Sequence, residues 1–372
     1  MFQAFSKTEI RVLSKEEGYR CLRELAADGT GTAVVVSRGA VERLGLKETL
    51  PQKCRYVTSF SSNPTVDELL ECLRTLDQIP VKRLICIGGG SAIDMGKALC
   101  AVLSMEGGGP RDYEGLCRTI TEKEYTGAEK SMDLIAVPTT AGTGADVTQW
   151  ATVWDMRGKR KLSVDRPDLA PDLSLIIPAF TADMPPGLTL STGLDALAQA
   201  MESFWAKARN PLSQSLALEA VAYIRKYLPL ALKEPGDLTY RGGMCMGALL
   251  SGLAFSKTRT TACHSISYPL TMYHGVQHGF AAAVTLEQVA ERNRQAVPEI
   301  ETLFGLFGGR EKFHQWLTEV SEDIQPLRLS AMGIREQDLP KLAEGAFTQG
   351  RMDNNPVSLR KEDVCAILKG VL

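Results

Sequence analysis

The chain has 372 residues, 44% of them hydrophobic and 23% charged, which is enough for two globular domains with sizeable cores. Its 42 Lys and Arg nearly balance its 44 Asp and Glu, so nothing favours nucleic acid as a partner. Nine cysteines without paired spacing predict mostly buried free thiols in a reducing compartment. No signal-peptide core or membrane-length apolar run is present, so we expect a cytoplasmic protein without a membrane partner.

The first half of the chain alternates strand-like runs with turns and helical segments, which is typical of an α/β domain. The expected buried strands are Thr32–Val36, Arg55–Phe60, Arg83–Ile87, Leu134–Val137 and Leu173–Ile177. Thr65 and Glu68 fit a capping box at the start of a helix that runs to about Leu76. The segments Thr148–Trp154 and Lys161–Val164 flank a turn and predict a hairpin.

A run of small residues, Gly88, Gly89, Gly90 and Ser91, separates a buried strand from a helix expected over Ala92–Leu103. Glycine lets the backbone approach a pyrophosphate, and a helix N-terminus supplies N–H groups and a positive dipole. A simple tight turn is the alternative, because the run is not G-x-G-x-x-G. On the first helical turns, Asp94 suits a ribose or an amide, and Lys97 suits a phosphate or solvent.

Two further loops follow expected strands, where open α/β folds bind ligands. Ser37 and Arg38 follow the first strand. The loop 138–144 is rich in glycine and hydroxyl groups, and Thr139, Thr140 and Thr143 are its candidate ligand donors, although a plain flexible loop has the same composition. Lys161, beyond the tip of the hairpin, is placed where it can turn inward.

The character of the sequence changes at Met184–Gly187, and nearly everything beyond has helical periodicity. We therefore expect an α/β domain over residues 1–185 and an all-helical domain over residues 186–372, with a cleft between domains as the default place for a site. The expected helical segments include Leu212–Tyr227, Tyr240–Phe255, Glu299–Leu306, Glu311–Val320 and Lys361–Leu368.

Two stretches of the helical half suggest a metal site. A helix expected to start at Ser191 or Thr192 carries Asp195 and Gln199 one turn apart, on a face that also carries Glu202. The stretch Lys257–Gly279 holds three of the four histidines, His264, His274 and His278. Imidazole, carboxylate and amide oxygen suit a divalent first-row metal. A solvated helix face and hydrogen-bonded loop histidines are the alternative.

The ordered motifs GGGSAIDMGKA, PTTAGTGADVT and TGLDALAQAMES, with His264 and His278, resemble the iron-containing (group III) alcohol dehydrogenases. The resemblance runs from about Thr32 to the C-terminus. It implies a Rossmann-like dinucleotide-binding domain followed by an all-α metal-binding domain, the fold shared with dehydroquinate synthase. It also implies that the metal, Fe²⁺ or Zn²⁺, is held by Asp195, Gln199, His264 and His278.

Two departures from the family pattern point to a subgroup. Gln199 stands where most members have histidine, which leaves the native metal open, and Tyr268 stands where many have a further histidine near the nicotinamide. The strings DALAQA, TTACHSISYPLT and RMDNNP look like those of the phosphonoacetaldehyde reductases. A phosphonate needs a cation, for which Arg259 is the first candidate and Arg351 the second; for each, a surface arginine is the alternative.

The resemblance implies reversible hydride transfer between a nicotinamide and a small aldehyde, with 2-hydroxyethylphosphonate as the expected product. Tyr268 and His274 are the candidate proton donors, although His274 suits a loop role equally. Arg38 favours NADPH over NADH, unless it only stacks on adenine. A homodimer or larger homo-oligomer is expected. The rivals are a generic alcohol dehydrogenase, a metal-free reductase similar to maleylacetate reductase, a lyase related to dehydroquinate synthase, and a non-catalytic nucleotide-binding protein.

Overall fold

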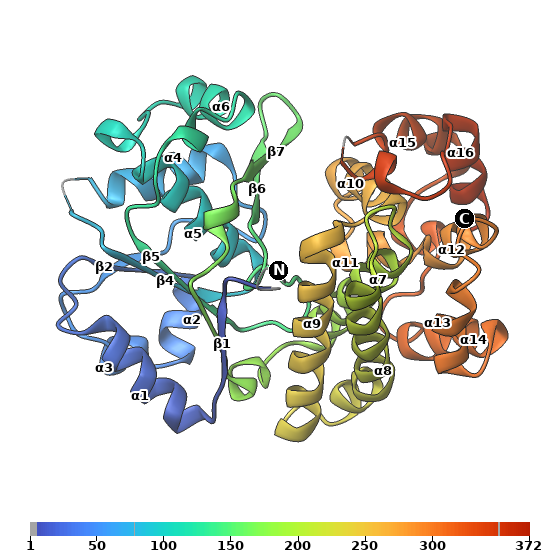
Figure 1. The fold of residues 1–372 in the computed structure, drawn as a ribbon, viewed down its shortest axis with the longest axis horizontal. Coiled ribbons are helices and arrows are strands. Elements are labelled where there is room, and N and C mark those ends of the chain that lie inside the picture. Colours follow the sequence, from blue (N-terminus) through green and yellow to red (C-terminus); the bar gives the residue numbers. More distant parts are fainter. Residues whose placement is uncertain (1–5, 78, 349) are drawn as a thin grey trace. The chain divides into compact units, whose positions relative to one another are not determined.

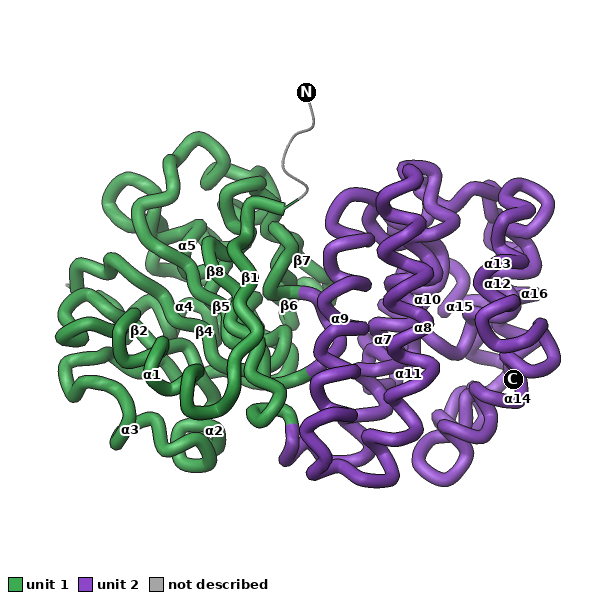
Figure 2. Tube along the Cα trace, turned by 60° about the horizontal axis from the view of Figure 1, so that its bottom comes forward, with its two compact units in different colours: residues 1–140, 145–181 green, residues 141–144, 182–372 purple. Residues whose placement is uncertain are grey.

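The computed structural model describes residues 6–77, 79–348 and 350–372. The chain forms two compact units (Figure 2): unit 1 runs to residue 140 and resumes over 145–181, while unit 2 comprises 141–144 and 182–372. Unit 1 is built on a parallel α/β sheet and unit 2 is helical, so the expected fold class is confirmed. The domain boundary that we expect between residues 185 and 186 remains a prediction.

Unit 1 contains a six-stranded sheet in the order β1-β8-β5-β4-β2-β3, in which every pair is parallel (Figure 1). Its strands are β1 (Glu9–Val12), β2 (Thr32–Val36), β3 (Arg55–Val57), β4 (Arg83–Gly88), β5 (Asp133–Pro138) and β8 (Leu173–Ile176). The edge strand β1 was not predicted, because its sequence EIRV carries two charges and has no apolar run. Strand β3 is shorter than predicted.

Helices cover both faces of this sheet because alternate strand residues point to opposite sides. Val34 and Val36 of β2 pack with α1 (Lys15–Ala26), α2 (Arg38–Arg43) and α3 (Leu46–Thr49). Ala33 and Val35 pack on the other side, with α4 (Val66–Thr75), α5 (Gly90–Leu103) and α6 (Tyr113–Thr121). Strands buried on both faces read as continuous apolar runs, which is why most were predictable.

Two local features that the sequence predicts are present in unit 1. The Thr65–Glu68 capping box is present at the start of α4. The expected hairpin is formed by β6 (Trp150–Asp155) and β7 (Arg160–Asp165), which pair antiparallel. Its basic tip is exposed, and Arg157 there pairs with Asp67 at 2.7 Å.

Unit 2 is organised around α7 (Pro186–Trp205), which is buried from Thr189 to Trp205. The helix begins five residues before the predicted start at Ser191, because Pro186 occupies its first turn, where proline is well tolerated. The other helices are α8 (Pro211–Lys233), α9 (Leu238–Thr258), α10 (Ala262–His274), α11 (His278–Ala283), α12 (Leu286–Asn293), α13 (Ile300–Phe307), α14 (Arg310–Ser321), α15 (Leu339–Gly345) and α16 (Lys361–Lys369).

The nine cysteines, all within the described residues, form no disulfide, and eight of them are buried, as expected for small apolar side chains. Across the described ranges, no helix has both the length and the apolar character needed to cross a bilayer.

Candidate metal and cofactor sites

The loops predicted to bind a dinucleotide meet at one edge of the unit 1 sheet. Strand β4 lies between β2 and β5, and their ends are in register, with Val36 opposite Ile87 and Gly88 opposite Pro138. The helix that follows β2 covers one face of the sheet, and the helix that follows β4 covers the other. The carboxyl ends of β2 and β4 therefore form a topological switch point, where open α/β sheets bind ligands.

Each predicted loop contributes small or polar groups at this edge. Ser37 caps α2 with its side chain, and Arg38 is the exposed first residue of that helix. Gly88 ends β4, and Gly89 caps α5, whose first turn holds Gly90 and Ser91. The Ser91 hydroxyl donates to the carbonyl of Ser62. Thr139 donates its backbone N–H to the carbonyl of Gly88 at 2.9 Å, which ties the loop after β5 to the glycine run.

Glycine leaves little spare room where the loops and α5 approach one another. A Cβ at Gly89 would lie 3.2 Å from Thr140, and one at Gly96 would lie 2.0 Å from the Sγ of Cys86. The first contact brings the glycine run against the hydroxyl-rich loop. The absence of a side chain at Gly96 lets α5 pack directly on β4. The N-terminus of α5 therefore lies at the carboxyl ends of the strands.

Asp94 and Lys97 attach α5 to the β6–β7 hairpin. Asp94 accepts the backbone N–H of Thr152 at 2.9 Å, and Lys97 donates to the carbonyl of Trp150 at 2.9 Å. Lys97 is fully buried, so our expectation that it faces a phosphate or solvent is wrong. Burial lowers its pKa to about 8. Burial raises the pKa of Asp94, while the charge of Lys97, the backbone N–H of Thr152 and the charge of Lys161 oppose that rise.

In unit 2, three predicted metal ligands gather around one point. One ligand atom each from Asp195, His264 and His278 lies within 4.8 Å of the others. His264 Nε2 is 3.2 Å and His278 Nε2 is 3.9 Å from Oδ1 of Asp195. Burial alone would raise the pKa of Asp195, but the two histidines outweigh it and hold that pKa below its ordinary value. Two imidazoles and one carboxylate are a ligand set for a divalent first-row metal.

Gln199 is the fourth predicted ligand. Its Oε1 atom is buried and accepts no hydrogen bond from the described residues. Its Nε2 atom is 3.5 Å from the carbonyl oxygen of Thr143, which fixes the side chain and brings Thr143 next to the ligand group. A buried acceptor without a donor is costly, and a cation at this point would satisfy it. The residues present therefore fit a metal, and Asp195, Gln199, His264 and His278 would hold it.

Glu202 orients one of these ligands, a role the sequence did not reveal. Its fully buried carboxylate accepts a hydrogen bond from Nδ1 of His264, the backbone N–H groups of Thr261 and Cys263 at 3.0 and 2.8 Å, and the Thr261 hydroxyl at 2.7 Å. Burial disfavours a charged imidazole, yet the neighbouring carboxylates, chiefly Glu202, raise the pKa of His264 above its ordinary value. A carboxylate on the far nitrogen of a ligating histidine fixes its tautomer and orientation. The i,i+7 spacing of Asp195 and Glu202 was the available signal.

His278 is oriented by a hydroxyl. Ser267 donates to the carbonyl of His264 at 2.7 Å, and its oxygen lies 3.4 Å from Nδ1 of His278. That hydroxyl can accept the Nδ1 proton, which leaves Nε2 as the ligating atom. The ring of Tyr268 is parallel to that of His278, with 6.1 Å between centroids. His274 instead is the exposed last residue of α10.

Close backbone contacts fix the helix that begins with His278. A Cβ at Gly279 would lie 1.7 Å from the carbonyl oxygen of Ser191, and one at Gly142 would lie 2.4 Å from that of Thr192. Only glycine lets α11 and the loop 141–144 approach α7 this closely. The same contacts hold His278 beside Asp195.

The two arginines predicted to bind substrate also lie in unit 2. Arg259 ends α9 as its C-cap, in the loop before the helix that carries His264. A Cβ at Gly350 would lie 2.8 Å from Nη1 of Arg259, and Arg351 donates to the carbonyl of Gly350 at 3.1 Å. Both guanidinium groups therefore lie against Gly350.

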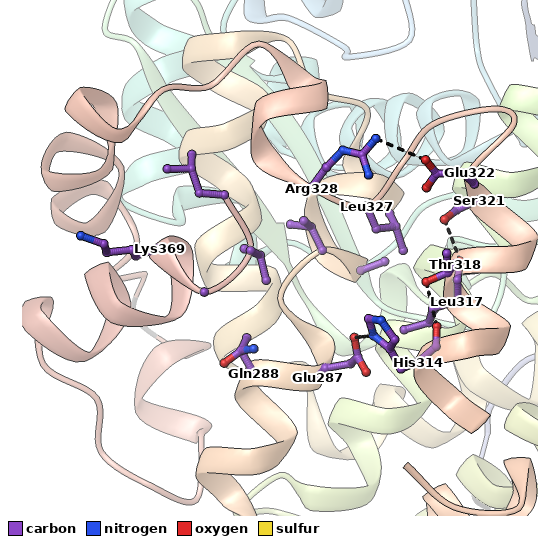
Figure 3. A pocket seen from close by; sticks show the side chains of 15 residues that line it. Glu287, Gln288, His314, Leu317, Thr318, Ser321, Glu322, Leu327, Arg328 and Lys369 are labelled. Carbon is purple, nitrogen blue, oxygen red and sulfur yellow. Dashed lines mark hydrogen bonds and ion pairs between the residues drawn. The ribbon is translucent and has the colours of Figure 1, made fainter. Parts of the chain in front are cut away.

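Unit 2 also has a groove of about 610 Å³ outside this ligand group (Figure 3). Nδ1 of His314 lies 2.9 Å from a carboxylate oxygen of Glu287, and Arg328 pairs with Glu322 at 3.2 Å. The lining includes none of the predicted ligands or arginines.

Comparisons with known proteins agree with this geometry. Residues 11–178 match the family described as iron-containing alcohol dehydrogenase, and residues 189–372 match the C-terminal domain of that family. Phosphonoacetaldehyde reductase of Streptomyces viridochromogenes is 31% identical over 321 residues, which cover 82% of this chain and 80% of that protein. The 1,3-propanediol dehydrogenase of Klebsiella pneumoniae is 30% identical over 298 residues, covering 77% and 75%.

Among solved structures, sulfoacetaldehyde reductase from Bifidobacterium kashiwanohense, in complex with NAD⁺, aligns with a TM-score of 0.85 and 27% identity, covering 100% of this chain and 98% of that one. The chain is thus a two-unit dehydrogenase with a dinucleotide-type sheet and a metal-ligand group. It belongs to the iron-containing alcohol dehydrogenase family. It is accordingly an oxidoreductase of a family that uses NAD(H) and a divalent metal.

Proposed function

We propose that this enzyme uses NAD(P)H to reduce a small aldehyde that carries an oxoanion, with phosphonoacetaldehyde, reduced to 2-hydroxyethylphosphonate, as the first candidate. The observation that carries the substrate class is the pair Arg259 and Arg351, whose guanidinium groups both lie against Gly350. Like charges gather most readily where an anion is bound, and guanidinium matches the oxygens of a phosphonate or sulfonate. Two of the similar proteins are named for acetaldehydes with such groups.

In this proposal, Asp195, Gln199, His264 and His278 hold the metal, and Glu202 and Ser267 keep the two imidazole rings in place. When bound, the metal supplies a Lewis acid that polarises the substrate carbonyl. The hydride passes from C4 of the dihydronicotinamide to the carbonyl carbon, and a proton passes to the oxygen. Tyr268, stacked beside His278, is our candidate for conducting that proton. His274 remains the second candidate, although its exposure favours a surface role.

We place the dinucleotide at the switch point between β2 and β4. The pyrophosphate would lie at Gly88–Ser91, and Thr139, Thr140, Thr143 and Lys161 would line the nicotinamide side. Ser37 and Arg38, at the end of β2, would meet the adenosine ribose. Because Arg38 is exposed and basic and no acidic residue replaces it there, we propose a preference for NADPH over NADH.

We further propose that the enzyme is cytoplasmic, takes part in phosphonate metabolism and forms a homodimer or larger homo-oligomer. A generic aldehyde reductase without an anion requirement is the main alternative, since 1,3-propanediol dehydrogenase is similar over much of the chain. A metal-free reductase is the second alternative, because Gln199 replaces an imidazole with a weaker ligand.

Steady-state oxidation of NADPH by the wild-type enzyme and Arg259→Ala, with phosphonoacetaldehyde, sulfoacetaldehyde and propanal, tests the substrate class. The wild type should prefer the oxoanionic aldehydes, and the variant should lose about a hundredfold of kcat/KM on them, as expected for a charged hydrogen-bonding partner. Arg259→Lys should recover only part of that loss. A wild type that reduces propanal as well as the charged aldehydes would make the enzyme a generic aldehyde reductase.

A further inference from the structure

Arg259 has a backbone conformation that is essentially reserved for glycine. Its φ is 61° and its ψ is 175°. A side chain in this region is strained, so another amino acid persists there only where the surroundings hold it, and such residues cluster at ligand-binding sites. Glycine would end α9 without this strain. The retained arginine therefore indicates a use for its side chain.

The structure shows what holds the strained residue. The side-chain amide of Asn354 donates to the carbonyl of Thr258 at 2.7 Å and to that of Thr260 at 3.0 Å, one on each side of Arg259. The Thr258 hydroxyl lies 3.0 Å from the Arg259 carbonyl oxygen, and the Arg259 N–H donates to Phe255 at 2.7 Å. Both amide protons of Asn354 are thus used to fix the backbone on either side of Arg259.

The loop that contains Arg259 is also attached to the metal-ligand helix. Thr258 bonds to Ser203 of α7 at 2.9 Å, and Thr261 bonds to both Glu202 and Trp205 of that helix. His264 follows Thr261 by one helical turn. Asn354, which lies much later in the sequence, therefore holds in place the loop that leads directly to a proposed metal ligand.

Asn354 itself belongs to the segment that presents the second arginine. Asn354 is the last residue of the short 3-10 helix Met352–Asn354. This helix follows Arg351 directly. The backbone carbonyl of Asn354 accepts the N–H of Lys207, and the Lys207 side chain donates to the carbonyl of Asp353 at 2.7 Å. One asparagine therefore links the backbone of the Arg259 loop to the segment that carries Arg351.

We propose that Asn354 is the positioning residue for recognition of the oxoanion, because it holds Arg259 in its glycine-like conformation and in register with Arg351. This rests on the proposed function: the ligand is the phosphonate or sulfonate group of the aldehyde. Asn354 does not touch the reacting atoms. It acts through Arg259.

The test compares two variants of Asn354. Asn354→Ala removes the amide, whereas Asn354→Asp keeps its size but replaces the donor with an oxygen that faces two carbonyl oxygens. In both, the ratio of kcat/KM for phosphonoacetaldehyde to that for propanal should fall about tenfold or more, mainly through a higher KM for the phosphonate. Asn210→Ala is the matched control, because it removes an asparagine that caps α8 without contacting the Arg259 loop.

Arg259→Gly provides a second measurement. If the arginine is kept for binding at the expense of backbone strain, this variant should lose the preference for the phosphonate while its Tm stays equal to or above that of the wild type. The proposal is overturned if Asn354→Ala and Asn354→Asp slow both substrates equally, or if Asn354→Asp retains the preference. A wild type without any preference would instead remove the proposed function.

Discussion

Glu202 accepts hydrogen bonds from His264 and from two backbone amides of the segment that leads to it, so one buried carboxylate fixes both the ring and its loop. Asp195 stands two helical turns earlier on the same face of α7 and lies on the other nitrogen of the same ring. A single helix thus supplies a ligand and the residue that aims another ligand at it.

Replacing Glu202 with glutamine should weaken metal binding about 10- to 100-fold, because the His264 ring loses its charged partner. Competition with a chromogenic chelator measures this affinity. Glu219→Gln, on the exposed face of α8, is the control and should bind metal like the wild type. An unchanged affinity in Glu202→Gln would show that the ring is held by packing alone.

At the scale of elements, the contact between α7 and α11 has no room for a side chain at Gly279. The variant Gly279→Ala must push α11 away from Ser191, and His278 moves with it. We expect a loss of about 1–3 kcal/mol of stability, as in other overpacked sites, together with lower metal content. Thermal unfolding and metal analysis measure the two effects.

Gly305→Ala is the matched control, since an added Cβ there meets nothing within 4 Å and alanine favours the helix. It should be as stable as the wild type or slightly more stable. Full metal occupancy in Gly279→Ala would contradict the role of this contact in placing His278.

The β6–β7 hairpin contains a carboxylate that links its stability to pH. Burial alone would raise the pKa of Asp155, but the Tyr113 hydroxyl, the Gly158 N–H and the Arg160 guanidinium outweigh it and lower that pKa to about 2. Because the folded pKa lies below the ordinary value of 3.8, Asp155 stabilises the fold above about pH 4. This contribution is lost as the pH falls through about 2.

Asp155→Asn should therefore lower the free energy of unfolding by about 1–2 kcal/mol at neutral pH, and its difference from the wild type should shrink between about pH 4 and pH 2. Chemical denaturation across this range measures the difference. Asp67→Asn is the control, because it breaks the exposed ion pair between Asp67 of α4 and Arg157 of the hairpin. It should lower the free energy of unfolding by less than about 0.5 kcal/mol. A constant difference for Asp155→Asn at all pH values would refute the linkage.

The elements that the sequence predicted are those with strong local patterns. Strand β2 has the predicted ends, since TAVVV is apolar throughout, and α4 begins at its capping box. The start of α7 was missed because Pro185-Pro186-Gly187 resembles a boundary, although proline also begins helices. The pairing of Asn354 with the carbonyls around Arg259 had no local signal, because only the tertiary fold brings these segments together.

At the scale of the whole molecule, the chain consists of two compact units with different tasks. Unit 1 offers the carboxyl ends of a parallel sheet, and unit 2 offers a partly buried ligand group and two arginines. The four residues 141–144 interrupt unit 1 and belong to unit 2, so the hydroxyl-rich loop contributes Thr139 and Thr140 to one unit and Thr143 to the other.

Turnover of phosphonoacetaldehyde with NADPH, measured before and after metal is removed from the purified enzyme, tests the proposed metal-dependent reduction most directly. We expect about one divalent metal per chain, loss of turnover on chelation, and recovery when Fe²⁺ or Zn²⁺ is added back. Wild-type turnover by protein that analysis shows to be metal-free would contradict it and would favour the metal-free reductase.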